Sequence, residues 1–450
     1  MIFTNGIIGL LVTVVSVVNA PSEAAEPPPN IIFIMADDLG YHDLGCYGQT
    51  KIQTPHIDRL AAEGIRFTNA YAGAPVCAPS RSVLMTGQHT GHTTVRGNFS
   101  RVENLVKDDR VPLLPEDTTV AEVLQRAGYV TGMTGKWGLG EPGTSGVPNA
   151  QGFDEWFGYL NQRNAHSYYP PYLWRDQKKV VLEGNQNGQR QTYSHDLFTD
   201  FALEFMQRHR DTSFFLYLPY TVPHDEYEIP DTAPYTNEDW SPEAKVHAAM
   251  ITRLDRDIGR MMDSLRAYGL DERTMIFFCS DNGAARRWDD TFRSSGILRG
   301  RKRDVYEGGL RTPMIVRMPG RVPTGVTSDV PWYFPDVLPT LAALADTEPP
   351  RRIDGVNVLP VITGQTDTLE ERTMYWEFHE RGFQQAARWK HWKAVRPAPD
   401  APLELYDLSV DVSEQFDVAS LHPTVVQQLD KYFRTARSDS KYWPDATLGK

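Results

Sequence analysis

Apolar residues gather in short continuous runs along the first three quarters of the chain, and longer amphipathic segments separate these runs. The runs have the length of strands that are buried on both faces of a sheet. They cover residues 30–35, 129–133, 213–219, 274–279 and 313–318. The segments with a helical period cover residues 57–63, 119–128, 242–268 and 332–345. This alternation predicts an α/β fold in which a large, mixed but mostly parallel sheet lies between helices.

The pattern changes after residue 364. Four short strand-like segments are separated by turns, and an amphipathic helical segment at 423–437 follows them. The strand-like segments cover residues 374–378, 386–390, 391–396 and 404–408. We therefore expect a catalytic domain over residues 26–365 and a smaller C-terminal antiparallel sheet with a terminal helix over residues 366–450.

An apolar run at residues 7–18 precedes a linker rich in Pro, Ala and Glu. The run is too short to span a bilayer and small residues follow it, which is typical of a secretory signal peptide, although no Lys or Arg precedes it. We expect a signal peptide at residues 1–25, a secreted or periplasmic protein and no stable membrane span. A buried N-terminal strand or an anchor is the alternative.

Polar side chains follow several of the apolar runs at their carboxyl ends, where open α/β sheets bind their ligands. These side chains are Asp37, Asp38, Lys136, His224 and Asp281. Three carboxylates together with the amide oxygen of Asn282 form a set of hard oxygen donors, which suits Ca²⁺ or Mg²⁺ and suits zinc poorly.

The composition narrows the range of partners. The chain has 450 residues, of which 40% are apolar and 23% charged, and its net charge is −12. No basic stripe stands out, which argues against nucleic acid as a partner. An acidic protein that handles an anionic substrate must build a local positive site. The three cysteines, Cys46, Cys77 and Cys279, do not make a disulfide framework.

Residues 76–87 read V-C-A-P-S-R-S-V-L-M-T-G. Pro79 and Ser80 indicate a helix start, which places Cys77 just ahead of a helix N-terminus, where an anion is favoured and Arg81 can reach the same point. A single cysteine in an apolar stretch is otherwise a buried thiol. The spacing C-x-P-S-R-x-x-x-x-T-G resembles the signature of the formylglycine-dependent sulfatases, whose fold is alkaline phosphatase-like.

The resemblance implies that an installing enzyme oxidises Cys77 to formylglycine, an aldehyde whose hydrate is the nucleophile. One hydrate oxygen attacks the sulfate ester, and the other later expels the sulfate as the aldehyde re-forms. It also implies a divalent cation, usually Ca²⁺ with Mg²⁺ as the other option. The implied ligands are Asp37, Asp38, the group made from Cys77, Asp281 and Asn282.

Further segments resemble the same family. Residues 135–140 read G-K-W-G-L-G, and residues 298–313 contain L-R-G-R-K followed by E-G-G-L-R-T-P. The resemblance implies that Arg81 holds the nucleophile, that Lys136 and Lys302 bind sulfate oxygens, and that His224 binds sulfate or protonates the leaving alcohol. The arginines near Lys302 are otherwise a solvated basic run.

One position departs from the family pattern. The family usually has a histidine where this chain has Gly138, and that histidine accepts a proton when sulfate is expelled. We expect His166 to stand in for it.

Residues 161–175 are rich in Tyr, Pro, Asn and His, which predicts a long functional loop. Residues 158–170, which overlap this loop, and residues 376–380 look like those of secreted bacterial carbohydrate sulfatases. We expect a sulfated carbohydrate substrate, with a galactose-type 4-sulfate as the specific ester. The expected sugar contacts are Asn161, Arg163, His166, His379 and Glu380.

Two alternatives remain. The first is a phosphodiester or phosphonate monoester hydrolase, since related enzymes share C-x-P-S-R and the metal pairs; the segments around Lys136 and Lys302 favour a sulfatase. The second is a non-catalytic binder of sulfated glycans, which requires that Cys77 remain a thiol.

Overall fold

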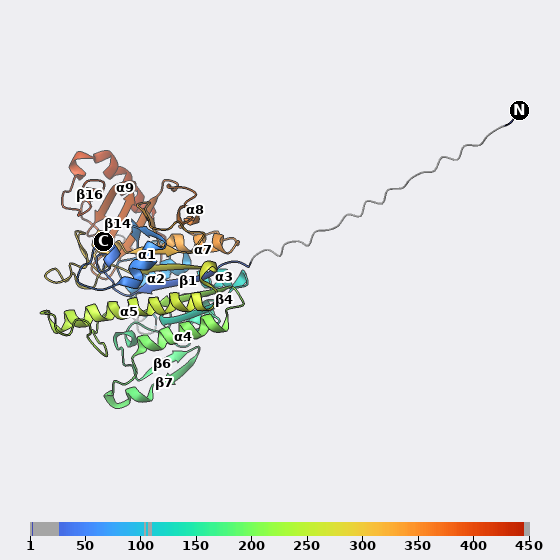
Figure 1. The fold of residues 1–450 in the computed structure, drawn as a ribbon. Helices are drawn as coiled ribbons and strands as arrows, with labels where there is room; N and C mark the ends of the chain where they lie inside the picture. The colour runs from blue at the N-terminus through green and yellow to red at the C-terminus, as the bar shows by residue number, and fades with distance from the viewer. Residues whose placement is uncertain (1, 3–26, 103–104, 107–109, 445–450) are drawn as a thin grey trace.

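The computed structural model describes residues 2, 27–102, 105–106 and 110–444, so the expected signal peptide at residues 1–25 lies almost wholly outside the described residues. A ten-stranded sheet crosses the molecule (Figure 1), in the order β11-β2-β10-β9-β1-β8-β4-β5-β6-β7. Its strands are β1 (Asn30–Ala36), β2 (Ile65–Phe67), β4 (Val130–Lys136), β5 (Glu155–Tyr159), β6 (Tyr172–Arg175), β7 (Lys178–Val181), β8 (Phe214–Pro219), β9 (Thr274–Ser280), β10 (Met314–Arg317) and β11 (Val326–Ser328).

The centre of this sheet is parallel: β1 pairs with β8 and β9, and β4 pairs with β5 and β8, in the same direction. Strand β10 runs antiparallel to both of its neighbours, and so does β6. The carboxyl ends of β1, β4, β8 and β9 therefore lie at one edge of the sheet. A second, two-stranded sheet consists of β3 (Ala70–Tyr71) and β12 (Trp332–Tyr333), which pair in parallel.

Helices cover both faces of the large sheet. Alternate residues of β1 belong to two separate cores: Phe33 packs with residues of α2, α3 and α7, and Ile34 packs with residues of α1, α4 and α5. These helices are α1 (Pro55–Ala62), α2 (Cys77–Thr86), α3 (Val120–Arg126), α4 (Ser194–Arg208), α5 (Pro242–Ala267) and α7 (Val337–Leu344), and the short α6 (Glu307–Leu310) and α8 (Leu359–Ile362) lie in connecting segments. The predicted fold of a mostly parallel sheet between helices is confirmed.

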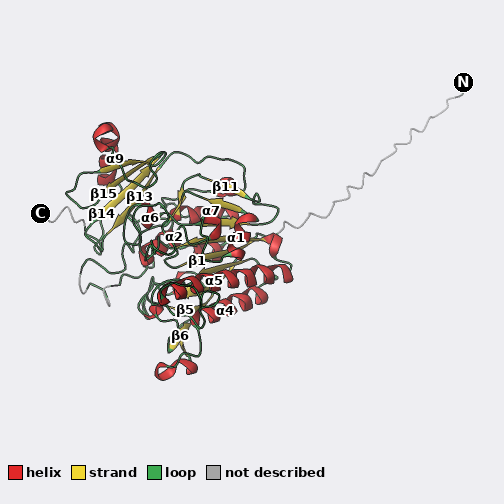
Figure 2. Cartoon of the chain, turned by 60° about the vertical axis from the view of Figure 1, so that its left-hand side comes forward, coloured by secondary structure: helices red, strands yellow, loops and turns green. Residues whose placement is uncertain are grey.

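The C-terminal region forms a separate four-stranded antiparallel sheet with a helix against it (Figure 2). Its elements are β13 (Thr373–Phe378), β14 (Gln384–Trp389), β15 (Trp392–Arg396), β16 (Glu404–Asp407) and α9 (Pro423–Thr435). Tyr375, Leu405 and Phe433 share one core that joins the sheet to α9. The small antiparallel sheet and its terminal helix were predicted correctly.

Three segments differ from the sequence expectation. Residues 332–345 were expected to be one helix, but Trp332 and Tyr333 pair with β3, and α7 begins only at Val337. Residues 161–175 are not loop throughout, because their end forms β6, which pairs with β5 and β7. The pattern also gave no indication of α4, whose fifteen residues form one of the outer layers.

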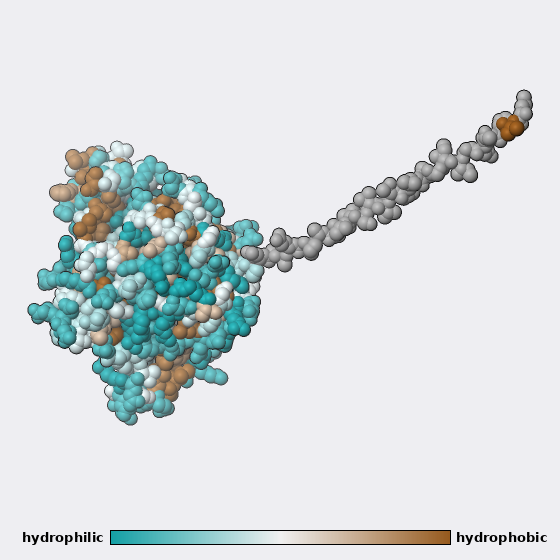
Figure 3. Space-filling model, in the orientation of Figure 1, coloured by the Kyte–Doolittle hydropathy of each residue, from teal (hydrophilic) through white to brown (hydrophobic). Residues whose placement is uncertain are grey.

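Most of the visible surface is hydrophilic, and apolar side chains gather over the C-terminal sheet and the β6–β7 hairpin (Figure 3). The exposed apolar residues there include Val181, Val410, Phe416 and Leu421. Among the described helices, none combines the length and the apolar character that a membrane crossing requires. Cys46, Cys77 and Cys279 are free cysteines.

Candidate active site

Helix α2 places Cys77 at the carboxyl edge of the large sheet. Val76 is the N-cap with extended backbone, and Cys77 is the first residue of the helix, so the helix begins two residues before Pro79 and earlier than expected. Every residue of α2 is buried, and Gly87 ends the helix in the left-handed conformation. The Sγ atom of Cys77 lies 3.6 Å from Oδ1 of Asp37. The cysteine is thus fixed at a helix N-terminus beside the first carboxylate.

Two neighbouring strands bring the four oxygen donors together. Ala36 at the end of β1 and Ser280 at the end of β9 are in register, so Asp37 and Asp281 follow side by side. The backbone N–H of Asp38 donates to Asp281 Oδ1 (3.1 Å), and Asn282 Nδ2 donates to Asp38 Oδ1 (2.7 Å). The amide oxygen of Asn282 is buried and has no hydrogen-bond partner among the described residues.

Positively charged side chains from helix α2 and strand β4 contact these carboxylates. Arg81 on α2 donates to Asp281 Oδ2 through Nε and Nη2 (3.2 and 2.8 Å) and lies 3.3 Å from Asp37 Oδ2. Its Nη1 donates to the carbonyl oxygen of Lys136. Lys136, the last residue of β4, donates from Nζ to Asp37 Oδ2 (2.5 Å). Arg81 therefore connects α2 to the ends of three strands.

Lys302 and His224 form the opposite side of the cluster. Lys302 Nζ lies 2.8 Å from Asp38 Oδ2 and 3.1 Å from His224 Nε2. His224 follows β8, and its Nδ1 lies 2.9 Å from Asp225 Oδ1. Burial opposes the charged form of Lys302, but Asp38 and Asp37 raise its pKa above the usual value. Lys302 is therefore a permanent positive charge in the site.

Burial and neighbouring charges act unequally on the pKa values of Asp37 and Asp281. Burial raises the pKa of Asp37, but Lys136, His224 and Arg81 outweigh it and hold that pKa well below the ordinary value. Burial and the nearby Asp37 raise the pKa of Asp281 to about 6, although Arg81 opposes them. Converging carboxylates with a free amide oxygen fit a divalent cation with a preference for oxygen ligands.

A pocket of about 580 Å³ opens above Cys77. Its lining includes His224, Lys302, Arg163 and His166. The ring of His166 stands perpendicular to that of His224 with 4.5 Å between their centroids, and burial together with the charge on His224 lowers the pKa of His166 to about 4. Two of the five expected sugar contacts thus face the same cavity as the cysteine.

The other three expected sugar contacts lie outside this lining. Asn161 donates to Glu141 Oε2 (3.2 Å) behind the loop. His379 is buried and lies 2.9 Å from Glu377 Oε1. Glu380 accepts a hydrogen bond from the backbone N–H of Asn98 (2.9 Å), a residue that does line the pocket.

Sequence reasoning missed Gln162, which lines the pocket and is largely buried. An ideal Cβ at Gly138 would lie 2.4 Å from Gln162 Nε2, so the amide occupies the space that a side chain at position 138 would need. Gly138 has φ 81°, and Nε2 of Gln162 has no partner among the described residues. Only the fold brings these two positions together, since 24 residues separate them.

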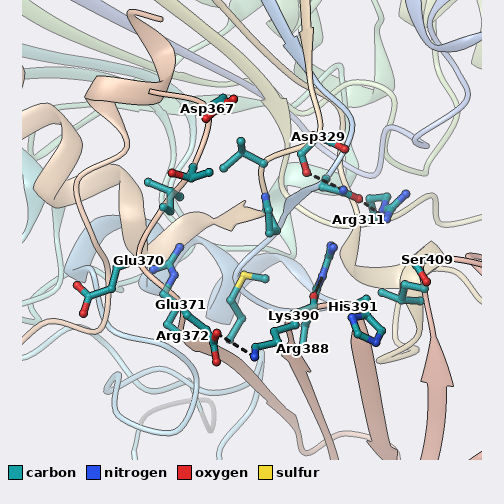
Figure 4. A pocket seen from close by; sticks show the side chains of 17 residues that line it. Arg311, Asp329, Asp367, Glu370, Glu371, Arg372, Arg388, Lys390, His391 and Ser409 are labelled. Atoms are coloured by element: carbon teal, nitrogen blue, oxygen red, sulfur yellow. Dashed lines mark hydrogen bonds and ion pairs between the residues drawn. The ribbon is translucent and has the colours of Figure 1, made fainter. Parts of the chain in front are cut away.

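Another cavity, of about 760 Å³, lies between the large sheet and the C-terminal sheet (Figure 4). Figure 4 shows Lys390 paired with Glu371 at its wall, and the two side chains are 3.0 Å apart. None of the site residues predicted from the sequence lines it.

A second group of possible metal ligands is His89, His92 and Asp354. The two imidazole rings stack 4.3 Å apart, and His89 Nδ1 accepts a hydrogen bond from the backbone N–H of Gly91 (3.2 Å). The lone pairs of the two imidazoles lie in the planes of their rings, and those of stacked rings do not converge on one ion. We therefore interpret the group as a hydrogen-bonded contact between His92 and Asp354 with His89 stacked on it.

Comparison with known proteins identifies a family and several relatives. The family model described as Sulfatase matches residues 29–347, and the model described as N-sulphoglucosamine sulphohydrolase, C-terminal, matches residues 300–438. Human arylsulfatase A is 32% identical over 90% of this chain and 87% of its own length. The N-acetylgalactosamine-6-O-sulfatase of Bacteroides thetaiotaomicron is 29% identical over 91% of this chain and 93% of its own. The crystal structure of Ps i-CgsB in complex with k-i-k-neocarrahexaose superposes with a TM-score of 0.81 at 28% identity, and the match covers 94% of this chain and 96% of that one.

Proposed function

The chain belongs to the sulfatase family, and we propose that it removes sulfate from a sulfated carbohydrate with a nucleophile made from Cys77. The observation that carries the proposal is the position of Cys77, at the first residue of α2, 3.6 Å from Asp37 and in the same pocket as His224 and Lys302. Relatives named for carbohydrate sulfates, such as the N-acetylgalactosamine-6-O-sulfatase, support the substrate class.

We propose formylglycine, installed by a separate enzyme, as the active form of Cys77, in keeping with the family's general dependence on it. The hydrate of that aldehyde supplies the attacking oxygen. Asp37, Asp38, Asp281 and Asn282, with the group made from Cys77, would hold Ca²⁺ or Mg²⁺, because all four side chains offer oxygen and the amide oxygen of Asn282 is unpartnered among the described residues. The cation would supply positive charge for a sulfate oxygen.

The residues of the chain itself supply the remaining positive charge. Arg81 orients the nucleophile, since it is anchored to both Asp281 and Asp37. Lys136, which pairs with Asp37, and Lys302, which pairs with Asp38, bind the sulfate oxygens, on which charge accumulates in the transition state. His224 and Lys302, whose nitrogens are 3.1 Å apart, stabilise the leaving alcohol oxygen, and His224 protonates it from Nε2.

Release of sulfate needs a proton acceptor, and Gly138 has no side chain to provide one. We propose that His166 takes this role. Its pKa of about 4 leaves the imidazole neutral near pH 7, so a ring nitrogen is free to accept a proton. An unchanged turnover in His166→Ala would contradict this assignment.

Within the carbohydrate sulfates we propose a galactose-type 4-sulfate, contacted by Arg163 and His166 from the loop after β5. Asn161, His379 and Glu380 would support the rim of the pocket through the contacts described above. We also propose a secreted or periplasmic location for the mature enzyme, in line with the signal peptide expected at residues 1–25.

The test starts with the tryptic peptide 67–81 of protein made in a host that installs formylglycine. We expect its mass to show the aldehyde or its hydrate at position 77, and we expect this preparation to hydrolyse an aryl sulfate faster than an aryl phosphate diester. Cys77→Ala is the matched control and should be inactive. Faster turnover of the diester would favour the phosphodiesterase alternative, and an unmodified thiol with glycan binding but no turnover would favour the binder.

A further inference from the structure

The pocket above Cys77 is lined by positive charge, although acidic residues outnumber basic ones in the chain, 58 to 46. Two carboxylates, Asp225 and Glu226, face six cationic side chains across it. The cationic side chains are those of Arg110, Arg163, Arg301, Lys302, Arg303 and Arg381. Reaction at one sulfate group is already served by Lys136, Lys302 and the proposed divalent cation, so the remaining arginines exceed what a single sulfate needs.

Four of these arginines can be compared by whether they form an ion pair with a carboxylate of the protein. Arg303 pairs with Glu380 and Arg381 pairs with Asp304, each at 3.5 Å. Arg163 and Arg301 form no ion pair within the described ranges. Because a guanidinium matches the oxygens of a sulfate or a carboxylate in a bidentate way, these two side chains are ready to bind an oxyanion.

The backbone holds Arg301 in place while its side chain remains exposed. Its N–H donates to Asp304 Oδ2 (3.0 Å), and the next N–H, that of Lys302, donates to the carbonyl oxygen of Ala284 (3.0 Å). The adjacent side chain of Lys302 reaches the reacting centre at Asp38. Arg301 is therefore anchored through the backbone next to Lys302, and both residues line the same pocket.

The volume of the pocket agrees with a ligand larger than one sulfated ring, since about 580 Å³ lies within the range that holds drug-sized molecules. Resting on the proposed function, we propose that the substrate is an oligosaccharide with a second anionic group on the sugar next to the sulfate ester, and that Arg163 and Arg301 bind this group. The group is an oxyanion, either a second sulfate or a uronate carboxylate.

The experiment compares three disaccharides that carry the same scissile sulfate and differ only in the neighbouring sugar, which is uncharged, sulfated or a uronate. For the formylglycine-bearing enzyme we expect kcat/KM to be roughly tenfold or more higher for an anionic neighbour, mainly through a lower KM. Whichever of the two anionic disaccharides has the higher kcat/KM shows whether the bound group is a second sulfate or a carboxylate. Salt should reduce the preference.

In Arg301→Gln and Arg163→Gln the ratio of kcat/KM between the anionic and the uncharged disaccharide should fall toward one. Arg126→Gln is the matched control: Arg126 is exposed near the end of α3, before β4, and so at the opposite edge of the sheet from Lys136. This variant should keep the wild-type ratio.

Equal kcat/KM for all three disaccharides in the wild type would overturn the proposal, and so would a loss in Arg301→Gln that is the same for charged and uncharged substrates. If the formylglycine-bearing enzyme hydrolysed none of the disaccharides and no aryl sulfate, the proposed function itself would fail, and this inference with it.

Discussion

Two clusters of buried charge lie at either end of the segment 302–307, and they differ in what surrounds them. In the junction triad, defined here as Glu307, Lys393 and Glu414, Lys393 Nζ lies 2.8 Å from Glu307 and 3.6 Å from Glu414, and all three side chains are fully buried. In the site cluster, the charges around Asp37 and Asp38 open on a pocket through Lys302 and His224.

The difference separates stability from function. The residues of the junction triad come from α6, β15 and the segment after β16. Its ion pairs therefore join α6, which lies between β9 and β10 of the large sheet in the sequence, to the C-terminal sheet. The site cluster gathers carboxylates that repel one another and keeps Asn282 Oδ1 unpartnered within the described part of the chain. Removing one partner of an enclosed ion pair leaves an unpaired buried charge and destabilises the fold, whereas a charge open to a cavity is available to a ligand.

The largest effect expected from this contrast is on catalysis. Asp38→Asn should lower kcat/KM for an aryl sulfate by about 10³-fold, because it removes one negative oxygen ligand from the proposed metal site. The left-handed backbone of Asp38 (φ 65°) also accommodates Asn, so the fold should persist. Steady-state kinetics, metal content and a thermal melt measure the outcome.

Asp346→Asn is the control for this substitution, since Asp346 is exposed, has φ 52° and lies far along the chain after α7. Wild-type activity in Asp38→Asn would remove Asp38 from the metal site. A large loss of thermal stability with an equal loss of activity would make it a structural residue instead.

The next effect concerns the junction triad. Lys393→Met should destabilise the protein by about 3–5 kcal/mol, because Glu414 would remain buried without its ion-pair partner and Glu307 would keep its pair with Arg311 alone. The protein that stays folded should keep its kcat, since none of the three residues lines the pocket above Cys77. Chemical denaturation and active-site-normalised kinetics test both statements.

Lys390→Met is the matched control, because Lys390 makes its 3.0 Å pair with Glu371 at the exposed surface, where such pairs contribute less than about 1 kcal/mol. If both variants lowered the free energy of unfolding by the same amount, burial of the junction triad would not explain its contribution to stability.

The smallest effect concerns Gln162. Gln162→Leu should lower kcat/KM for a sulfated sugar roughly 10- to 100-fold and leave the melting temperature almost unchanged, because Nε2 of Gln162 has no partner among the described residues and is available to donate to a substrate. Gln427→Leu on the exposed side of α9 is the control. A fall in stability without a change in sugar turnover would make Gln162 a packing residue that merely fills the space above Gly138.

Much of the site could be predicted from the sequence because its residues follow directly on strands. Asp37 and Asp281 come immediately after β1 and β9, and parallel strands deliver their carboxyl ends to one edge whatever the loops do. The sugar-facing residues were harder to predict. His379 lies in a stretch that is polar like the pocket, yet the fold turns it toward Glu377 in the interior.

The sequence by itself determined the layered α/β architecture, and it singled out Cys77 and the oxygen donors that we propose as nucleophile and metal ligands, because these depend on local periodicity and on short motifs at strand ends. Only the tertiary structure decided that β10 runs antiparallel, that Gln162 takes the space above Gly138, and that Arg163 and Arg301 share one pocket. These features are contacts between distant segments. Their geometry depends on how loops pack over the finished sheet, and no local pattern encodes it.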